Sequence, residues 1–236
     1  MIRFRKAVLI IHGFTGNLYD NEYLMNYLEY EPRLDVYAKT LPGHAQERFH
    51  DCRYREWVNF VEDEIEHLIQ NGYHQIYVIG HSMGGVLASV IATKYKQVKK
   101  LVLVNAAFDY FNFKQNKIDL LENKNFDKYK GILDKAFRTS PIFIIEFAKL
   151  VKKYRFVINN LKCDTLILQS TEDEIIPLET GEFIYNNVST DKKYLTYLKG
   201  CSHVVFRGNR KDEVSEYIKV FLKGGLKWKK TMKKEL

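Results

Sequence analysis

A short apolar run that gives way to a helical pattern within about three residues constrains this chain more than any other feature. The run is Ile76–Ile79, and apolar residues recur after it at helical spacing over 86–91. Ser82 occupies the turn, inside Gly80-His81-Ser82-Met83-Gly84. This stretch satisfies G-x-S-x-G in the strand–turn–helix context that the motif requires. Such a turn strains the serine backbone and leaves the hydroxyl pointing outward, while the glycines let strand and helix approach closely.

Two other interpretations of this glycine-rich turn compete with that of a nucleophilic serine. A phosphate-binding loop would require G-x-G-x-x-G or a Lys-Ser/Thr ending, and the sequence has neither here. The other reading is an ordinary strand-to-helix connection that carries an inert serine. Which reading holds depends on whether the rest of the chain supplies a base.

Apolar runs and helical patterns alternate along most of the chain. The apolar runs are Ala7–Ile11, Leu34–Ala38, Ile76–Ile79, Leu101–Val104, Thr165–Gln169 and Tyr194–Leu198. The helical patterns are Asn21–Glu29, Arg53–Ile69, Met83–Tyr95, Leu178–Asn187 and Asp212–Leu222. This alternation predicts the α/β class, with a mostly parallel, doubly wound sheet of about six strands and right-handed crossovers.

One long gap breaks the alternation between Val104 and Thr165. It spans about sixty residues, far more than a normal crossover, so it predicts an inserted subdomain. Ser140-Pro141 inside it has the pattern of an N-cap followed by the first residue of a helix. We therefore expect a core formed by 1–108 and 161–223, a helical cap formed by 109–160, and a basic tail at 224–236.

The insert is rich in aromatic residues, and most of them are expected to fill its own small core. An insertion that leaves the carboxyl end of a strand also lies above the sheet edge where α/β proteins bind ligands. Phe143 and Phe147 are the candidates for lining a substrate pocket there.

A serine hydroxyl needs a base, and the base needs a group that orients it. Asp173 follows the apolar run Thr165–Gln169, and His203 follows Tyr194–Leu198. The chain order serine, acid, histidine is that of the catalytic triads that accompany a G-x-S-x-G turn. All three residues would lie at the same sheet edge. We expect His203 to accept the proton of Ser82 and Asp173 to orient the imidazole. The neighbours of Asp173, Glu172 and Glu174, remain alternatives for the acid.

A tetrahedral intermediate also needs hydrogen-bond donors for its oxyanion. The residue after the nucleophile, Met83, supplies one N–H, and Phe14 in the loop "HGFTGN" can supply the second. The histidines His12, His44 and His81 are interpreted as structural. The histidines form no H-E-x-x-H or other metal-ligand spacing. We therefore expect neither a metal nor a cofactor.

Composition places limits on location and partners. The 236 residues are 46% hydrophobic and 28% charged, which is typical of a globular chain. No apolar stretch approaches the ~18 residues of a membrane helix, so we expect no stable membrane insertion. Three cysteines without C-x-x-C spacing disfavour a disulfide framework and a zinc knuckle. A cytoplasmic protein is the simplest expectation, and its oligomeric state is left open.

The net charge of +8 raises the question of an anionic partner. Part of that charge is local, because the last fourteen residues carry six lysines and one glutamate. Runs of like charge usually repel one another and stay solvated. We therefore expect a solvated tail rather than a binding arm, and no nucleic-acid partner.

The motifs "HGFTGN", "LPGHA", "GHSMGG", "TEDEIIP" and "GCSHVV", taken in order, resemble the α/β-hydrolase family, in particular its bacterial carboxylesterases and monoacylglycerol lipase-like enzymes. The resemblance covers about Ala7 to Leu222. It departs at Ala45, where a second glycine is common, and in the family's leading antiparallel strands, which are expected to be shortened or missing.

The resemblance implies Ser82, Asp173 and His203 as triad, Phe14 and Met83 as oxyanion donors, and a small-molecule ester as substrate. The expected activity is hydrolysis of short to medium acyl esters, monoacylglycerols among them, through an acyl-enzyme. A thioesterase, an acyltransferase and a non-catalytic binding protein of the same fold are the alternatives.

Overall fold

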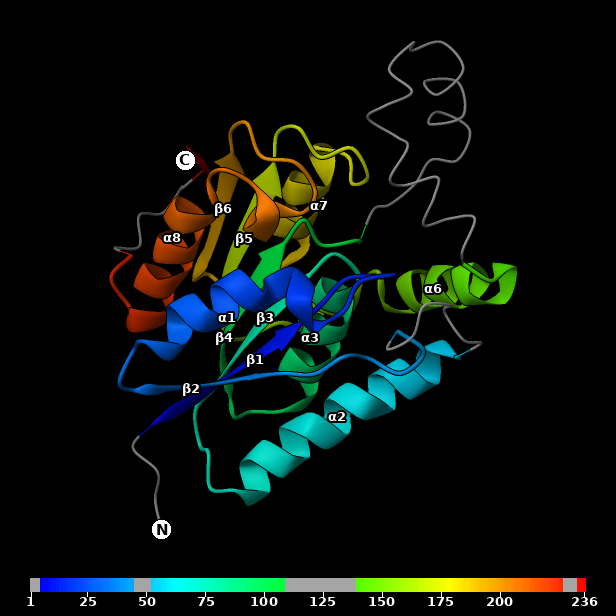
Figure 1. Cartoon of the computed structure of the whole chain (residues 1–236), viewed down its shortest axis with the longest axis horizontal. Helices are drawn as coiled ribbons and strands as arrows, with labels where there is room; N and C mark the ends of the chain where they lie inside the picture. The colour runs from blue at the N-terminus through cyan, green and yellow to red at the C-terminus, as the bar shows by residue number, and fades with distance from the viewer. Residues whose placement is uncertain (1–4, 45–51, 109–138, 227–232) are drawn as a thin grey trace.

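The computed structural model describes residues 5–44, 52–108, 139–226 and 233–236. Within them the chain forms one seven-stranded sheet (Figure 1). The strands are β1 (Lys6–Ile11), β2 (Leu34–Ala38), β3 (Ile76–His81), β4 (Val98–Val104), β5 (Asp164–Ser170), β6 (Lys193–Leu198) and β7 (Lys233–Glu235). The helices are α1 (Glu22–Glu29), α2 (Tyr54–Gln70), α3 (Met83–Lys94), α6 (Pro141–Tyr154), α7 (Glu179–Asn187) and α8 (Lys211–Lys223), with short 3-10 turns at Leu18–Asn21, Val157–Asn160 and Val205–Arg207.

The strand order is β2-β1-β3-β4-β5-β6-β7, and every neighbouring pair is parallel. Parallel strands end at the same sheet edge, so the loops after β1, β3, β5 and β6 share one edge. Pairing of Ile11 with Gly80 brings the loop after β1 beside the turn after β3. The order reverses between β1 and β3, where open α/β sheets bind their ligands.

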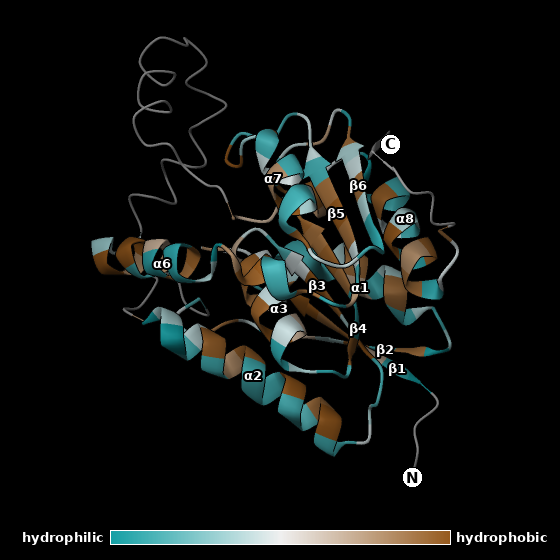
Figure 2. Ribbon diagram, turned by 180° about the vertical axis from the view of Figure 1, so that it is seen from behind, coloured by the Kyte–Doolittle hydropathy of each residue, from teal (hydrophilic) through white to brown (hydrophobic). Residues whose placement is uncertain are grey.

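Helices cover both faces of the sheet (Figures 1 and 2). Alternate residues of each strand point to opposite faces. On β1, Leu9 and Ile11 pack in the core beneath α2 and α3, whereas Val8 and Ile10 pack in the core beneath α1 and α8. Burial on both faces explains why these strands read as continuous apolar runs instead of alternating ones.

The cap prediction at 109–160 lies partly outside the described residues, which resume at 139. Within the described part, α6 begins at Pro141 as predicted, and the Ser140 hydroxyl accepts a hydrogen bond from the Ile142 amide at 3.2 Å. Its buried residue Glu146 accepts from the Tyr54 amide at 3.1 Å. This hydrogen bond satisfies an otherwise free N–H of the first turn of α2, and it connects α6 to α2.

The predicted solvated tail is wrong for its last residues. Lys233–Glu235 pair with β6 as an edge strand, and the Leu236 amide donates to the Tyr197 carbonyl at 2.9 Å. Residues 227–232 of that tail lie outside the described part. The free backbone groups along β6 explain the pairing, because a sheet edge offers hydrogen bonds to any extended segment.

No helix in the described part of the chain is long and apolar enough to cross a membrane. The cysteines Cys52, Cys163 and Cys201 are free thiols in the structure.

Candidate active site

Ser82 lies in the turn between β3 and α3 with φ 53° and ψ −120°. A positive φ is costly for a residue with a side chain, so the surrounding structure must hold it there. A Cβ at Gly80 would lie 2.3 Å from the Gly84 carbonyl oxygen, and one at Gly84 would lie 2.2 Å from that of Ile11. No side chain fits at either position, so both glycines of the motif are required by close backbone approach.

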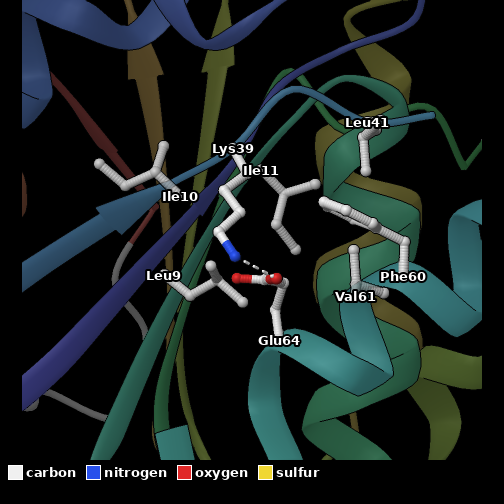
Figure 3. A pocket seen from close by; sticks show the side chains of 8 residues that line it. All are labelled: Leu9, Ile10, Ile11, Lys39, Leu41, Phe60, Val61 and Glu64. Atoms are coloured by element: carbon white, nitrogen blue, oxygen red, sulfur yellow. Dashed lines mark hydrogen bonds and ion pairs between the residues drawn. The ribbon is translucent and has the colours of Figure 1, made fainter. Parts of the chain in front are cut away.

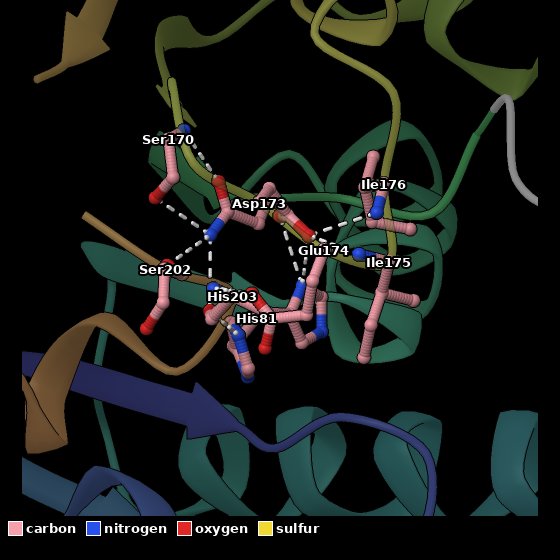
Figure 4. Close-up of polar contacts among 9 residues, drawn as sticks. His81, Ser170, Asp173, Glu174, Ile175, Ile176, Ser202 and His203 are labelled. Atoms are coloured by element: carbon pink, nitrogen blue, oxygen red, sulfur yellow. Dashed lines mark hydrogen bonds and ion pairs between the residues drawn. The ribbon is translucent and has the colours of Figure 1, made fainter. Parts of the chain in front are cut away.

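His203 and Asp173 meet at the sheet edge (Figure 4). The Nδ1 atom of His203 lies 2.9 and 3.0 Å from the two carboxylate oxygens of Asp173. Both side chains are nearly inaccessible to water, at 7% and 1% exposure. Because a carboxylate accepts, this contact places the proton on Nδ1 and leaves Nε2 as the basic nitrogen of the neutral ring.

The loop after β5 also separates the roles of the neighbouring carboxylates. Oδ1 of Asp173 accepts hydrogen bonds from the Ile175 and Ile176 amides, both at 2.8 Å. Glu174 instead accepts from the backbone amide of His203 at 3.0 Å. Asp173 therefore contacts the imidazole while Glu174 fixes the main chain of the histidine.

The Ser82 hydroxyl donates to and accepts from no residue that the structure describes, His203 included. The structure therefore brings His203 and Asp173 into contact, while the Ser82–His203 link of the predicted triad is not formed. Ser82 does lie beside the loop after β1, since a Cβ at Gly13 would be 3.0 Å from the Ser82 Cβ. Apo sites often have long catalytic hydrogen bonds that shorten only with substrate.

The proposed oxyanion donors come from two segments that pack together. Phe14 follows Gly13 in the loop after β1, and Met83 is the first residue of α3. A helix N-terminus has free N–H groups and a partial positive charge, which suits a developing oxyanion. Residues 11–13 approach Ser82 and Gly84 closely, so the loop that contains Phe14 lies beside the turn that precedes Met83.

Three buried histidines near the site act as structural residues. His12 Nε2 accepts from the Leu41 amide at 2.9 Å, and burial lowers its pKa to about 4. Burial likewise lowers the pKa of His44 to about 3 and that of His81 to about 4. His81 Nε2 donates to the His203 carbonyl at 2.9 Å. All three are neutral at pH 7, consistent with the sequence interpretation.

Phe143 and Phe147, the predicted pocket residues, lie on the inner face of α6. Phe143 is fully buried and Phe147 is 9% exposed. Both rings stack on Phe14, with centroid distances of 5.0 and 4.7 Å. In the described structure they therefore contact the loop after β1 through Phe14, and Phe143 offers no surface to a ligand.

A cavity elsewhere in the molecule is not a substrate site. It lies between β1 and α2, and the ion-paired side chains of Lys39 and Glu64 are among the residues that line it (Figure 3). Its volume of about 10 Å³ holds at most one water molecule. The described residues also contain no cluster of three or more potential metal ligands.

Two residues of the site carried no sequence signal of their role. Asn105 follows β4 and binds the His203 loop, but a lone asparagine after a strand matches no motif. Glu174 was considered only as an alternative acid. Although no motif points to them, their position could have suggested both residues, because each follows a strand at the sheet edge where Ser82 lies.

Comparisons with known proteins agree with this fold. The family model described as "alpha/beta hydrolase fold" matches residues 6–126, which is more than half of the chain. The carboxylesterase of Bacillus subtilis (strain 168) is 27% identical over 92% of this chain and 92% of its own length. The thermostable monoacylglycerol lipase of Bacillus sp. (strain H-257) is 26% identical over 84% of this chain and 82% of its own length.

Solved structures show the same fold. A structure of the metagenome-derived lipolytic enzymes LipS and LipT matches with a TM-score of 0.77 at 20% identity, covering 94% of this chain and 95% of that one. The Paleococcus ferrophilus monoacylglycerol lipase matches with a TM-score of 0.72 at 17% identity, covering 95% and 96%. The parallel sheet, the serine elbow after β3 and the family match lead to one conclusion: this chain belongs to the alpha/beta hydrolase fold family.

Proposed function

We propose that this chain is a serine hydrolase that cleaves carboxylic esters of short to medium acyl chains through an acyl-enzyme. The observation that carries the proposal is the strained serine at φ 53° on the same sheet edge as a buried histidine–aspartate pair. A binding protein has no use for a base that is oriented by a buried carboxylate. The carboxylesterase and the monoacylglycerol lipase among the relatives favour esters as the substrate class.

In this proposal His203 accepts the proton of Ser82 as the hydroxyl attacks the ester carbonyl. Asp173 stabilises the imidazolium and holds the proton on Nδ1. The N–H groups of Phe14 and Met83 bind the oxyanion, and His203 then protonates the departing alcohol. His203 then takes a proton from water as the water attacks the acyl-enzyme, and it returns the proton to the Ser82 oxygen as the carboxylic acid leaves.

The acyl preference is proposed from the small size of the insert. An apolar slot gains about 0.8 kcal/mol for each methylene it buries, so kcat/KM should rise with acyl length until the slot is full. A small cap uses most of its apolar surface for its own packing. Neutral esters such as monoacylglycerols are therefore the proposed substrates. Thioester hydrolysis and acyl transfer need the same three groups, and a panel of esters, thioesters and amides separates the three activities.

The decisive experiment replaces Ser82 by alanine. We expect kcat to fall on the order of 10⁶-fold, as in other serine triads, with the fold intact. Covalent labelling by a fluorophosphonate should disappear in the same variant. Turnover above about a hundredth of the wild-type rate in Ser82→Ala would show that another group is the nucleophile.

A further inference from the structure

Asn105 is an unusual residue in the turn after β4. It is fully buried and has φ 46°, a conformation that it shares with Ser82 and Thr15 among the described non-glycine residues. Asparagine tolerates this conformation better than most residues, because its short side chain can hydrogen-bond locally. Burial of an amide is costly unless its polar atoms are bound, so its partners should explain why it is there.

The Asn105 side chain joins β4 to β5 and to the loop after β6. Its Oδ1 accepts from the Ser170 amide at 2.8 Å, which fixes the orientation of the amide group. Its Nδ2 then donates to the Ser170 hydroxyl at 2.9 Å and to the His203 carbonyl at 3.0 Å. Nδ2 also lies 3.4 Å from the Ser202 carbonyl. Figure 4 shows Ser170, Ser202 and His203, the residues that these hydrogen bonds connect.

The main chain of His203 is consequently held from both sides. Two side chains, Asn105 and His81, donate to its carbonyl oxygen at 3.0 and 2.9 Å. On the other side Glu174 accepts from its amide at 3.0 Å. The imidazole itself is bound at Nδ1 by Asp173. With the main chain and Nδ1 both fixed, the direction of Nε2 is fixed as well.

We propose that Asn105 is a positioning residue that, together with His81, fixes the main chain of His203 and so aims its imidazole at Ser82. The inference rests on the proposed function, because it assigns His203 the role of base. Proton transfer requires the two heavy atoms to come within hydrogen-bond reach. A displacement of about 1 Å at a catalytic group can reduce the rate by about 10²-fold. Loss of Asn105 should therefore act on kcat, whereas KM should change little.

The test compares Asn105→Gly, Asn105→Asp and the control Ser170→Ala. Glycine keeps the positive φ and removes the amide, while aspartate keeps the shape and turns an oxygen toward the two carbonyls. Ser170→Ala removes one bond of Asn105 but leaves the bond to His203. We expect kcat to fall about 10- to 100-fold in both Asn105 variants with KM within about threefold, and little change in Ser170→Ala.

A spectroscopic readout separates positioning from general destabilisation. The proton between His203 Nδ1 and Asp173 should give a low-field proton NMR signal, identified by its loss in Asp173→Asn. We expect the signal to be broadened or lost in the Asn105 variants and retained in Ser170→Ala.

Three results would overturn the inference: wild-type kcat in both Asn105 variants, equal losses in Ser170→Ala, or unfolding of both Asn105 variants, which would assign Asn105 a purely structural role. Failure of the proposed function looks different, because wild-type protein would then hydrolyse no ester or Ser82→Ala would remain active.

Discussion

At the scale of single residues, the three carboxylates of 172–174 should differ sharply in their contribution to the rate. Asp173 contacts the imidazole, Glu174 contacts only the main chain of His203, and Glu172 is exposed. We expect Asp173→Asn to lower kcat by roughly 10⁴-fold, because an amide favours the wrong histidine tautomer. Glu174→Gln should have a much smaller effect and Glu172→Gln almost none.

The ranking of the three variants is the test, measured as kcat on one p-nitrophenyl ester at pH 8. A larger loss of kcat in Glu174→Gln than in Asp173→Asn would assign the role of the triad acid to Glu174. Glu174→Gln should cost more than Glu172→Gln, since the Glu174 carboxylate accepts a hydrogen bond from the His203 amide at 3.0 Å.

How far single residues could be predicted from the sequence depended on whether they belong to a motif. Ser82 was identified because G-x-S-x-G is imposed by close backbone approach at Gly80 and Gly84. Asp173 and His203 could be proposed from the sequence because each follows a strand and the chain order fits, and the structure joins their side chains. Asn105 was missed, because its proposed role depends on hydrogen bonds to residues that lie 65 and 98 positions away in the sequence. Such contacts exist only after the sheet has assembled.

At the scale of elements, α6 is expected to act on the loop after β1, which contains Phe14, as well as on the substrate. Phe147 stacks on Phe14 at 4.7 Å and is only 9% exposed. We expect Phe147→Leu to lower kcat for every acyl length, because Phe14 loses a ring that orients its loop. Initial rates on p-nitrophenyl esters from acetate to palmitate, below their micellar concentrations, measure this.

A pocket-lining role for Phe147 predicts a different profile. The optimum length would then move toward longer chains, and turnover of acetate, which does not fill the pocket, would be unchanged. Phe60 on α2 is a partly buried aromatic residue that packs against the same core, so Phe60→Leu serves as the control for a general loss of packing. For the wild type we expect a peak at an intermediate length.

The elements themselves were predicted well where the apolar pattern was continuous. The six expected strands correspond to β1 to β6, and the start of α6 at Pro141 followed from the Ser-Pro pattern. β7 was missed because Lys233–Glu235 has no apolar or β-branched residue. Its pairing depends on the free edge of β6, which a local pattern cannot reveal.

At the scale of the whole molecule, the buried histidines should make the fold sensitive to acid. The pKa values of His12, His44 and His81 are lowered by burial to about 4, 3 and 4, whereas unfolded histidine titrates near 6.5. Below pH 6.5 the unfolded chain therefore binds more protons than the folded one. The free energy of unfolding consequently decreases as the pH is lowered. The loss is fully developed only near pH 3 to 4.

Urea unfolding at pH 7 and pH 5 measures this effect. We expect the free energy of unfolding to fall by about 5 kcal/mol, with each buried histidine contributing a share. Replacing one of them, as in His44→Asn, should reduce the pH dependence by about a third, whatever its effect on stability at pH 7. An unchanged slope in that variant would mean that His44 has the same pKa in the folded protein as in the unfolded chain.

Truncation after Gly225 should destabilise the molecule without removing activity. It deletes β7 and two hydrogen bonds to the Leu236 carbonyl. The Lys199 amide donates one of them at 3.1 Å, and the Arg210 guanidinium donates the other at 2.9 Å. Each bond contributes about 0.5–1.5 kcal/mol, so the unfolding midpoint in urea should fall measurably. Ester turnover at 25 °C should be nearly unchanged. Turnover lost from a truncated protein that is still folded would show that the end of the chain supports the site.

The parallel strand order has a consequence for the rate of folding. Ser82 belongs to the part of the chain before the insert, whereas Asp173 and His203 belong to the part after it, and β4 pairs directly with β5 across that separation. Pairing of segments far apart in the sequence is slow, because the entropy of closing the loop is lost before any contact forms. During refolding, secondary structure should therefore recover first. Esterase activity should return in a later, slower phase that reports the docking of β5 on β4.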